Sequence, residues 1–188
     1  MKKILPIFIA IALSAGFVAC SDDDDDIDLN DYTEWRTQND EWVAEMMAKT
    51  NPDGTPYYTS VVPVWNPGAY VLIHYFNDRS ETAGNLTPLY TSVVDVFYDG
   101  YDCEGNLFDS SEGVTTYGIP GTQRFAINNT IQGWAIALEN MHVGDTCEVI
   151  VPYQVAYGTT YSSSIKPYSS LRFNIRLTDI YRYEGIPD

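Results

Sequence analysis

The chain has 188 residues, enough for one ordinary domain with short appendages and too few for two large ones. Aromatic residues make up 14% of it and tyrosine alone occurs 15 times, a composition that suits strands more than helices. The formal net charge of −16 argues against a nucleic-acid partner, because phosphate binding needs a basic face.

The N-terminus is predicted to be a signal peptide rather than part of the fold. Lys2 and Lys3 precede an uncharged apolar run, residues 5–19, which is too short to span a bilayer comfortably. The run ends in Phe-Val-Ala-Cys, which resembles the lipobox of bacterial lipoproteins, although Phe17 stands where leucine is usual. We therefore predict a signal peptide over residues 1–19 and a lipid on Cys20. The alternative is an ordinary signal peptide that is cut after Ala19.

An acidic segment follows the predicted lipid site. Ser21 precedes five adjacent aspartates, residues 22–26, which repel one another and stay solvated. We interpret residues 20–29 as a lipidated acidic tether. Its composition also resembles a surface-export signal of Bacteroidetes lipoproteins, and the alternative is a simple spacer. The predicted location is the cell envelope, lipid-anchored at the outer membrane, with its periplasmic or surface side left open.

A helix and a linker are predicted over residues 30–53. Asn30 or Asp31 can cap a helix that runs from Tyr32 to Ala48. Its apolar stripe is predicted to consist of Trp35, Trp42, Met46 and Met47. The run Thr-Asn-Pro-Asp-Gly over residues 50–54 ends it. We interpret this helix as one that packs on the following domain and is dispensable for that domain's fold.

From Tyr57 onward the sequence pattern is typical of short strands. The predicted strands are Tyr58–Trp65, Tyr70–Tyr75, Ser92–Tyr98, Thr146–Val151 and Leu171–Ile180. In the third of these, Val94, Val96 and Tyr98 share one face, and Val93, Asp95 and Phe97 share the other. A short helix is predicted over residues 132–141, because Trp134, Leu138 and Met141 recur at helical spacing. The expected fold class is α+β, with the helix on one face of an antiparallel sheet.

The sequence offers little material for nucleophilic or metal-assisted catalysis. It has no Gly-rich phosphate loop, no metal-spaced His/Cys cluster and no Ser/His/Asp set. His74 and His142 are the only histidines, and each is expected to be an ordinary structural residue. We therefore expect no metal and no cofactor. What remains is a set of aromatic residues with one carboxylate.

Four stretches of the chain carry a family resemblance. They are Val96-Phe-Tyr-Asp-Gly100, Gly105-Asn-Leu-Phe-Asp-Ser-Ser111, Ile131-Gln-Gly-Trp134 and Ala156-Tyr-Gly158. With their spacing, they resemble FKBP-type peptidyl-prolyl cis/trans isomerases over about two-thirds of the chain. The resemblance implies an FKBP-like domain over residues 54–188, an antiparallel five-stranded sheet that wraps a short helix, here preceded by the N-terminal helix.

The resemblance also implies a site. In it, Trp134 forms the floor of an apolar pocket for a prolyl ring, Tyr157 donates its hydroxyl to a substrate carbonyl, and Asp109 is the polar group at the edge. The implied walls are Tyr98, Phe108, Phe125, Ile131, Ile165 and Phe173, and the backbone N–H of Ile131 is a further donor. The chain departs from the family pattern at Glu112-Gly-Val114, where arginine is frequent, and at Lys166, where proline is common. The segment from Phe125 to Thr130 is also shorter than usual, which makes Gln123 a candidate wall residue.

The implied function is acceleration of X-Pro isomerisation, which assists the folding of exported proteins. The implied partners are proline-containing polypeptides, macrolides and the membrane through the lipid, and we expect a monomer. One alternative is a catalytically weak FKBP-like peptide-binding or chaperone module on a lipid anchor. Another is a surface lipoprotein that serves a nutrient-uptake assembly. The resemblance further implies that Cys103 and Cys147 are not neighbours and form no bridge.

Overall fold

The structure, a computed structural model, describes residues 28–116, 119–162 and 165–181. The predicted signal peptide, Cys20 and the aspartate run over residues 22–26 lie outside the described residues. No helix in the described ranges is long and apolar enough to cross a membrane.

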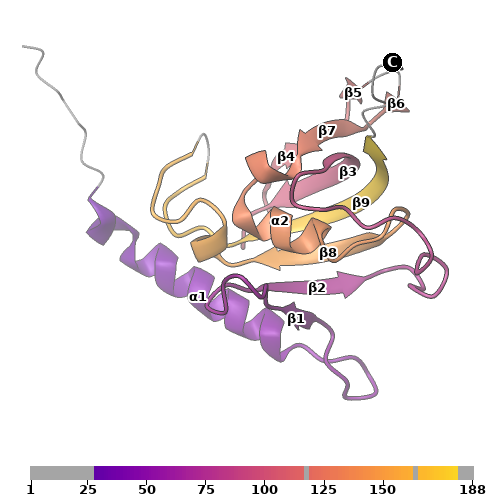
Figure 1. The fold of residues 1–188 in the computed structure, drawn as a ribbon. Coiled ribbons are helices and arrows are strands. Elements are labelled where there is room, and N and C mark those ends of the chain that lie inside the picture. The colour runs from indigo at the N-terminus through magenta and orange to yellow at the C-terminus, as the bar shows by residue number, and fades with distance from the viewer. Residues whose placement is uncertain (1–27, 117–118, 163–164, 182–188) are drawn as a thin grey trace, which may run out of the picture.

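A curved antiparallel sheet dominates the fold (Figure 1). Its strands are β1 (Thr59–Val61), β2 (Val71–Tyr75), β3 (Val93–Tyr101), β4 (Leu107–Ser110), β7 (Gln123–Ala126), β8 (Thr146–Val151) and β9 (Leu171–Tyr181). They lie in the order β1-β2-β8-β9-β3-β4, and β7 also pairs with β3. A separate small hairpin joins β5 (Thr115–Thr116) and β6 (Ile119–Pro120). Short 3₁₀ turns occupy Leu29–Tyr32, Ile127–Asn129 and Tyr153–Val155.

The α+β class and the antiparallel arrangement are confirmed, but within the described residues the sheet has seven strands where five were predicted. The additional strands, β4 and β7, pair with opposite halves of the long strand β3. The predicted strand at residues 58–65 is reduced to Thr59–Val61. Pro63 has no N–H for a ladder, and the next residue, Val64, is 97% exposed.

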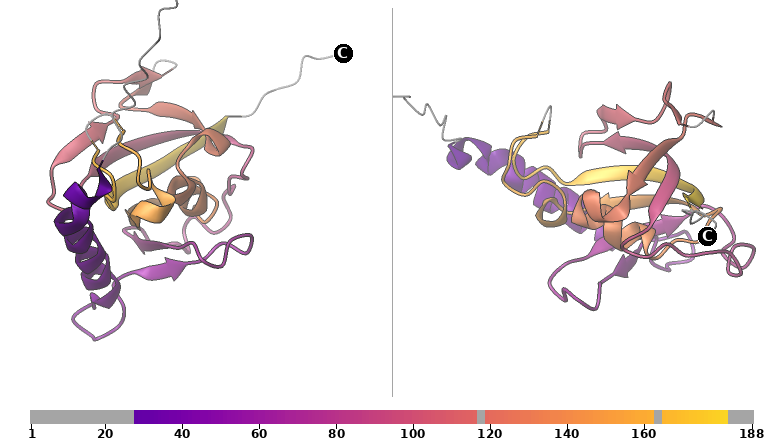
Figure 2. Two further views of the ribbon diagram at one scale, coloured as in Figure 1. Left: turned by 90° about the vertical axis from the view of Figure 1, so that its left-hand side faces the viewer. Right: turned by 45° about the horizontal axis from the view of Figure 1, so that its top comes forward.

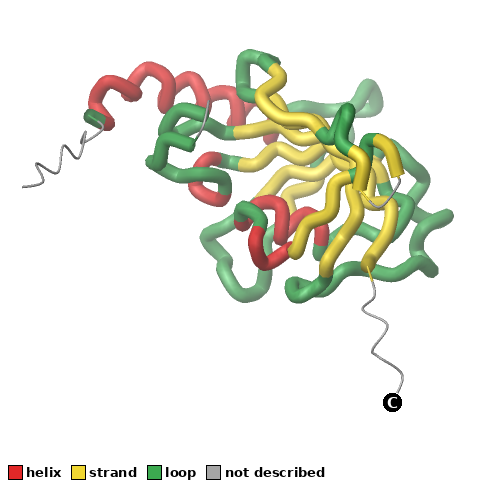
Figure 3. The backbone as a smooth tube through the Cα atoms, turned by 90° about the horizontal axis from the view of Figure 1, so that it is seen from above, coloured by secondary structure: helices red, strands yellow, loops and turns green. Residues whose placement is uncertain are grey.

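The main core lies between one face of the sheet and helix α2 (Gln132–Leu138). The view from above in Figure 3 shows the curved run of strands with this helix on one side of it. Val94, Val96 and Tyr98 all point into this core, as the alternation predicts. Asp95 faces the other way and is also buried, because Arg124 meets its carboxylate with Nε at 2.6 Å and a second nitrogen at 2.7 Å.

Helix α1 (Thr33–Ala48) packs on part of the other face of the sheet, over β2 and β8 (Figure 2). Along β2, Val71 and Ile73 belong to the core with α2, whereas Leu72 packs with Val43, Tyr58 and Ile150 in a second cluster. The predicted packing of this helix on the domain is confirmed, but its stripe is shifted. The buried helix residues are Asn39 and Val43, Trp42 and Met46 are only partly buried, and Met47 is exposed.

The two cysteines in the described residues are free, as predicted. Cys147 is fully buried in β8, with its sulfur 3.6 Å from that of Met141. Cys103 is half-buried in the turn between β3 and β4.

Candidate active site

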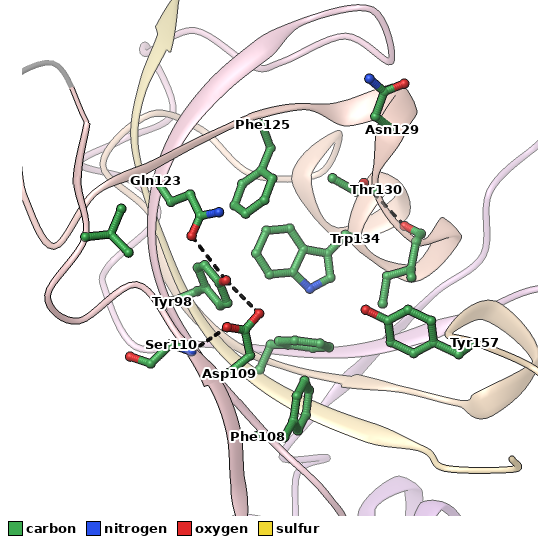
Figure 4. A pocket seen from close by; sticks show the side chains of 13 residues that line it. Tyr98, Phe108, Asp109, Ser110, Gln123, Phe125, Asn129, Thr130, Trp134 and Tyr157 are labelled. Atoms are coloured by element: carbon green, nitrogen blue, oxygen red, sulfur yellow. Dashed lines mark hydrogen bonds between the residues drawn. The ribbon is translucent and has the colours of Figure 1, made fainter. Parts of the chain in front are cut away.

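A pocket of about 390 Å³ opens between β3, β4, β7, the start of α2 and the segment after β8 (Figure 4). It is lined by Tyr98, Phe108, Asp109, Ser110, Val114, Gln123, Phe125, Asn129, Thr130, Ile131, Trp134, Tyr157 and Phe173. These residues come from segments far apart in the sequence, so the site exists only in the folded sheet.

The floor of the pocket is Trp134, which is 5% exposed. Three aromatic rings meet its indole edge to face, the geometry that aromatic quadrupoles favour. Tyr98 lies 5.0 Å away at 87°, and Phe125 and Phe173 each lie 5.3 Å away, at 76° and 87°. A second set of close contacts fixes the helix itself, because a Cβ on Gly133 would overlap the side chain of Val151 in β8. The indole is therefore held rigidly beneath an apolar cavity.

Asp109 is fixed at the edge of the pocket by two donors. The Tyr98 hydroxyl donates to its Oδ2 at 2.7 Å, and the Ser110 backbone N–H donates to its Oδ1 at 2.9 Å. The Tyr98 hydroxyl also lies 3.4 Å from Oε1 of Gln123, which lines the same pocket. Burial, together with the hydrogen bond to Asp109, raises the pKa of Tyr98 well above its ordinary value. The phenol therefore stays protonated and oriented toward the carboxylate.

The path of β4 explains how the Phe-Asp-Ser-Ser sequence brings Phe108 and Asp109 to the pocket. Ser111 binds Tyr98 in both directions: its hydroxyl accepts from the Tyr98 N–H at 2.9 Å, and its own N–H donates to the Tyr98 carbonyl at 2.9 Å. Phe108 meets Phe173 of β9 edge to face at 5.7 Å across Gly100. This short strand thereby delivers one aromatic wall and one carboxylate to the same cavity.

Several hydrogen-bond donors at the pocket have no acceptor among the described residues, and the buried Nε1 of Trp134 is one of them. The Tyr157 hydroxyl points into the cavity (Figure 4), and the backbone N–H of Ile131 precedes the first turn of α2. Burial and the nearby charge of Asp109 raise the pKa of Tyr157, so its hydroxyl remains a donor at neutral pH. The Tyr157 hydroxyl and the Ile131 N–H are thus available to a bound molecule that carries carbonyl oxygens.

All predicted site residues except Ile165 line this pocket. Ile165 is 7% exposed and packs into the main core. It also lines a smaller hollow of about 220 Å³ on the other side of Phe108. Sequence reasoning missed four lining residues, Ser110, Val114, Asn129 and Thr130. Of these, Ser110 and Thr130 had a signal, since Ser110 lies within the Phe-Asp-Ser-Ser stretch and Thr130 directly precedes Ile-Gln-Gly-Trp.

The lining of the pocket combines an aromatic floor with polar groups at its edge. In the described ranges, no group of three or more His, Cys, Asp and Glu residues could hold a metal ion. The polar groups of the pocket are a carboxylate, hydroxyls and amides around an aromatic floor. The geometry suits a compact apolar ring with flanking carbonyl groups.

The model of the FKBP-type peptidyl-prolyl cis-trans isomerase family matches residues 84–178, which include every predicted residue of the pocket. The chain belongs to this family. The FKBP domain is 37% identical over 106 residues to the macrophage infectivity potentiator of Trypanosoma cruzi, covering 56% of this chain and 52% of that protein. It is 38% identical over 94 residues to the FKBP-type 22 kDa peptidyl-prolyl cis-trans isomerase of Escherichia coli, covering 50% of this chain and 43% of that protein.

Further similarities agree with this membership. The outer membrane protein MIP of Legionella longbeachae is 35% identical over 116 residues, which are 61% of this chain and 48% of that protein. The chain thus spans about half the length of the curated relatives it matches. Among solved structures, a peptidyl-prolyl cis-trans isomerase from Pseudomonas syringae has a TM-score of 0.62 at 23% identity, with 80% of this chain and 96% of that chain covered. FkpA from Escherichia coli has a TM-score of 0.62 at 21% identity, with 80% of this chain and 61% of that chain covered.

Proposed function

We propose that this FKBP domain is a peptidyl-prolyl cis/trans isomerase that acts on proline-containing polypeptides and assists the folding of exported proteins. The observation that carries the proposal is a pocket with an aromatic floor at Trp134 and two uncommitted donors, Tyr157 and the Ile131 N–H. A prolyl ring fits the apolar floor, and its flanking carbonyls meet the donors.

The chemistry follows from the nature of the amide bond. Rotation about it has a barrier of roughly 18–20 kcal/mol, because resonance holds the bond planar. The twisted state has lost that resonance and is less polar, so a dry aromatic cavity destabilises the planar amide relative to the twisted one. The donors Tyr157 and Ile131 hold neighbouring carbonyls while the bond turns. The reaction requires no nucleophile and no proton transfer, and each 1.36 kcal/mol or so removed from the barrier accelerates it tenfold.

The test is an isomerisation assay on an X-Pro peptide, whose uncatalysed exchange takes about 10–100 s at 25 °C. We expect the protein to accelerate the exchange above background. Tyr157→Phe should lower the rate by only about 2- to 12-fold, since it deletes one hydrogen bond worth about 0.5–1.5 kcal/mol. Asp109→Ala should reduce the rate while the circular dichroism spectrum stays that of wild type, because Asp109 lies at the pocket edge.

The same assay decides against the catalytic proposal if wild type leaves the exchange at background. A protein that then still binds the peptide is the peptide-binding or chaperone module. If wild type is active but Asp109→Ala and Tyr157→Phe are both indistinguishable from it, the activity lies elsewhere and the site assignment fails.

Macrolides are proposed as ligands of the same pocket and should compete with the peptide. Sedimentation of the soluble domain tests the proposed monomer.

We further propose that Cys20 carries a lipid that anchors the protein to the outer membrane. The support is the uncharged run that ends at Ala19-Cys20, together with the name of a relative, outer membrane protein MIP of Legionella longbeachae. Cys20→Ala should abolish labelling by fatty acid, and labelling that persists would contradict the proposal. Protease treatment of intact cells separates the surface side from the periplasmic side. Co-purification would detect a nutrient-uptake assembly.

A further inference from the structure

Helix α1 lies outside the family match, which begins at residue 84, yet it contacts the segment between β8 and β9 that carries Tyr157. Figure 1 shows the first half of α1 beside this segment. The contacts between the two are specific polar and ring contacts rather than apolar packing alone, and they form a continuous path toward the pocket.

The path begins at Asn39, which is fully buried within α1. Its Nδ2 donates to the Trp35 carbonyl at 2.8 Å, and its Oδ1 accepts from the backbone N–H of Ser170 at 2.7 Å. Ser170 is itself 1% exposed, so its N–H has no access to water. A buried donor that is left without a partner destabilises the fold, because it has lost its hydrogen bonds to water and gained none in return. The polar side chain of Asn39 therefore fixes the position of Ser170.

The path continues from Ser170 to the residue next to Tyr157. The Ser170 hydroxyl accepts from the backbone N–H of Tyr153 at 3.1 Å, and Tyr153 is 8% exposed. The Tyr153 carbonyl in turn accepts from the N–H of Gly158 at 2.9 Å. A chain of hydrogen bonds thus links Asn39, Ser170, Tyr153 and Gly158, and it ends one residue after the pocket tyrosine.

The carbonyl group of Gly158 is also connected to α1, through Tyr168. The Gly158 carbonyl accepts from the N–H of Tyr168 at 2.9 Å. Tyr168 has a φ of 63°, a left-handed conformation that a non-glycine residue keeps only where its surroundings hold it. Arg36 of α1 lies 5.1 Å from the ring of Tyr168, which also meets the Tyr153 ring at 5.2 Å. Trp35 adds a hydrogen bond of 3.0 Å from its Nε1 to the hydroxyl of the neighbouring Ser169.

We propose that Asn39 is a positioning residue, which holds the Tyr157 hydroxyl in the pocket through Ser170, Tyr153 and Gly158. The inference rests on the proposed isomerase function. It gives α1 a part in turnover although none of its residues lines the pocket. Loss of the Asn39 side chain should act on the reaction only through Tyr157.

A double-mutant cycle tests this dependence. Asn39→Ala should lower kcat/KM for an X-Pro peptide by up to the effect of Tyr157→Phe, about 2- to 12-fold. In the Tyr157→Phe background, Asn39→Ala should lower it by less than about 1.5-fold, because the same contact cannot be lost twice. Ser170→Ala removes the next acceptor of the chain and should behave in the same way, so it replaces Asn39→Ala if that variant does not fold.

Val43→Ala is the matched control. Val43 lies one turn further along α1 and is 6% exposed, but it packs against Tyr58, Leu72 and Ile150 and takes no part in the hydrogen-bond chain. It should lower the stability of the protein and leave kcat/KM unchanged. Amide hydrogen exchange gives a second readout. Asn39→Ala should accelerate exchange at Gly158 more than at Val149 in the core, whereas Val43→Ala should not.

Several results would overturn the inference. Fully additive losses in the cycle would mean that Asn39 does not act through Tyr157. An unchanged kcat/KM in both Asn39→Ala and Ser170→Ala would mean that the chain does not set the position of the hydroxyl. An equal loss of activity in Val43→Ala would assign the effect to docking of the whole helix. If wild type is inactive, the proposed function fails and the positioning role fails with it, a result that differs from an active wild type with an additive cycle.

Discussion

Gly100 shows at the scale of one residue how closely the pocket walls approach the sheet. A Cβ at this position would meet Cζ of Phe108 at 2.8 Å and Cε1 of Phe173 at 2.9 Å. Gly100→Ala should therefore displace both aromatic walls, with a cost of about 1–3 kcal/mol in unfolding free energy and a lower isomerisation rate. Urea unfolding and the peptide assay measure the two effects.

Gly84→Ala serves as the control for this prediction. A Cβ on Gly84 meets no atom within 4 Å, so this change should stay within about 0.5 kcal/mol of wild type and leave the rate unchanged. A Gly100→Ala protein with the stability and rate of wild type would show that the two rings can move without consequence.

The hydroxyls of the pocket predict the pH dependence of the reaction. The pKa values of Tyr98 and Tyr157 are raised above about 10, the ordinary value for tyrosine. Burial is the main cause for both residues, and the proximity of Asp109 is the second. Both hydroxyls therefore keep their protons below pH 10, and the rate should be flat from about pH 6 to 9. The stability that Tyr98 contributes is likewise present below pH 10 and lost as the pH rises above it. A pH–rate profile with a bell near pH 7 would instead implicate a titrating base.

At the scale of elements, Asp145 ties the turn before β8 to the segment after β2. Its carboxylate accepts from Asn77 Nδ2 at 3.0 Å, from the Thr82 hydroxyl and from the His142 N–H at 2.7 Å, and Arg79 Nε lies 3.3 Å away. Burial raises the pKa of Asp145, but these hydrogen bonds and the Arg79 charge together outweigh burial and lower it.

Because the pKa of Asp145 is lowered in the folded protein, acid should remove the stability that this residue contributes. The stability from Asp145 is present above its unfolded pKa of about 3.9 and is lost as the pH falls through the lower folded value. Asp145→Asn should be less stable than wild type by about 1–3 kcal/mol at pH 7, and the difference should shrink below about pH 4. Denaturant titrations at several pH values measure this. Glu45→Gln, on the exposed side of α1, should show no such difference, and a gap that persists at pH 2 would contradict the assignment.

The strands show what the sequence pattern could and could not predict. β2, β8 and β9 are close to their predicted bounds, because each carries a run of β-branched and aromatic residues. β4 and β7 were missed as strands because they are short, only partly buried, and formed by pairing with halves of β3 rather than by their own pattern. The stripe of α1 was misplaced because Asn39, a polar residue, occupies its most buried position.

The site was predictable where the motif spacing fixes a side chain and not where a loop does. Tyr98, Phe108, Asp109 and Trp134 lie in β3, β4 and α2, whose packing determines their positions. Val114 and Asn129 reach the pocket from connections whose path depends on the whole fold, and Ile165 turns into the core for the same reason. Such positions require tertiary structure and cannot be inferred from local pattern.

At the scale of the whole molecule, α1 should stabilise the domain without being needed to form it. The main core with α2 contains no residue of α1, so a chain that begins at Gly54 should still melt cooperatively, as the sequence predicts. Removal of α1 exposes Leu72 and Ile150 to solvent. Burial of one such side chain contributes about 1.5–3 kcal/mol to the free energy of unfolding. We expect a melting temperature lower by about 10 °C. Calorimetry of both proteins measures this, and equal melting temperatures would mean that α1 packs without energetic consequence.

The two unbridged cysteines have a consequence for a protein that would leave the cytoplasm. Burial, with the neighbouring charges of Asp102 and Glu104, raises the pKa of Cys103 to about 11, and burial also raises the pKa of Cys147. At pH 7 only about one Cys103 in ten thousand is then a thiolate, the species that attacks disulfides. Oxidants and other thiol proteins in a secretory environment would react with it very slowly. The folded chain can therefore keep two reduced sulfurs where unprotected thiols would be captured in mixed disulfides.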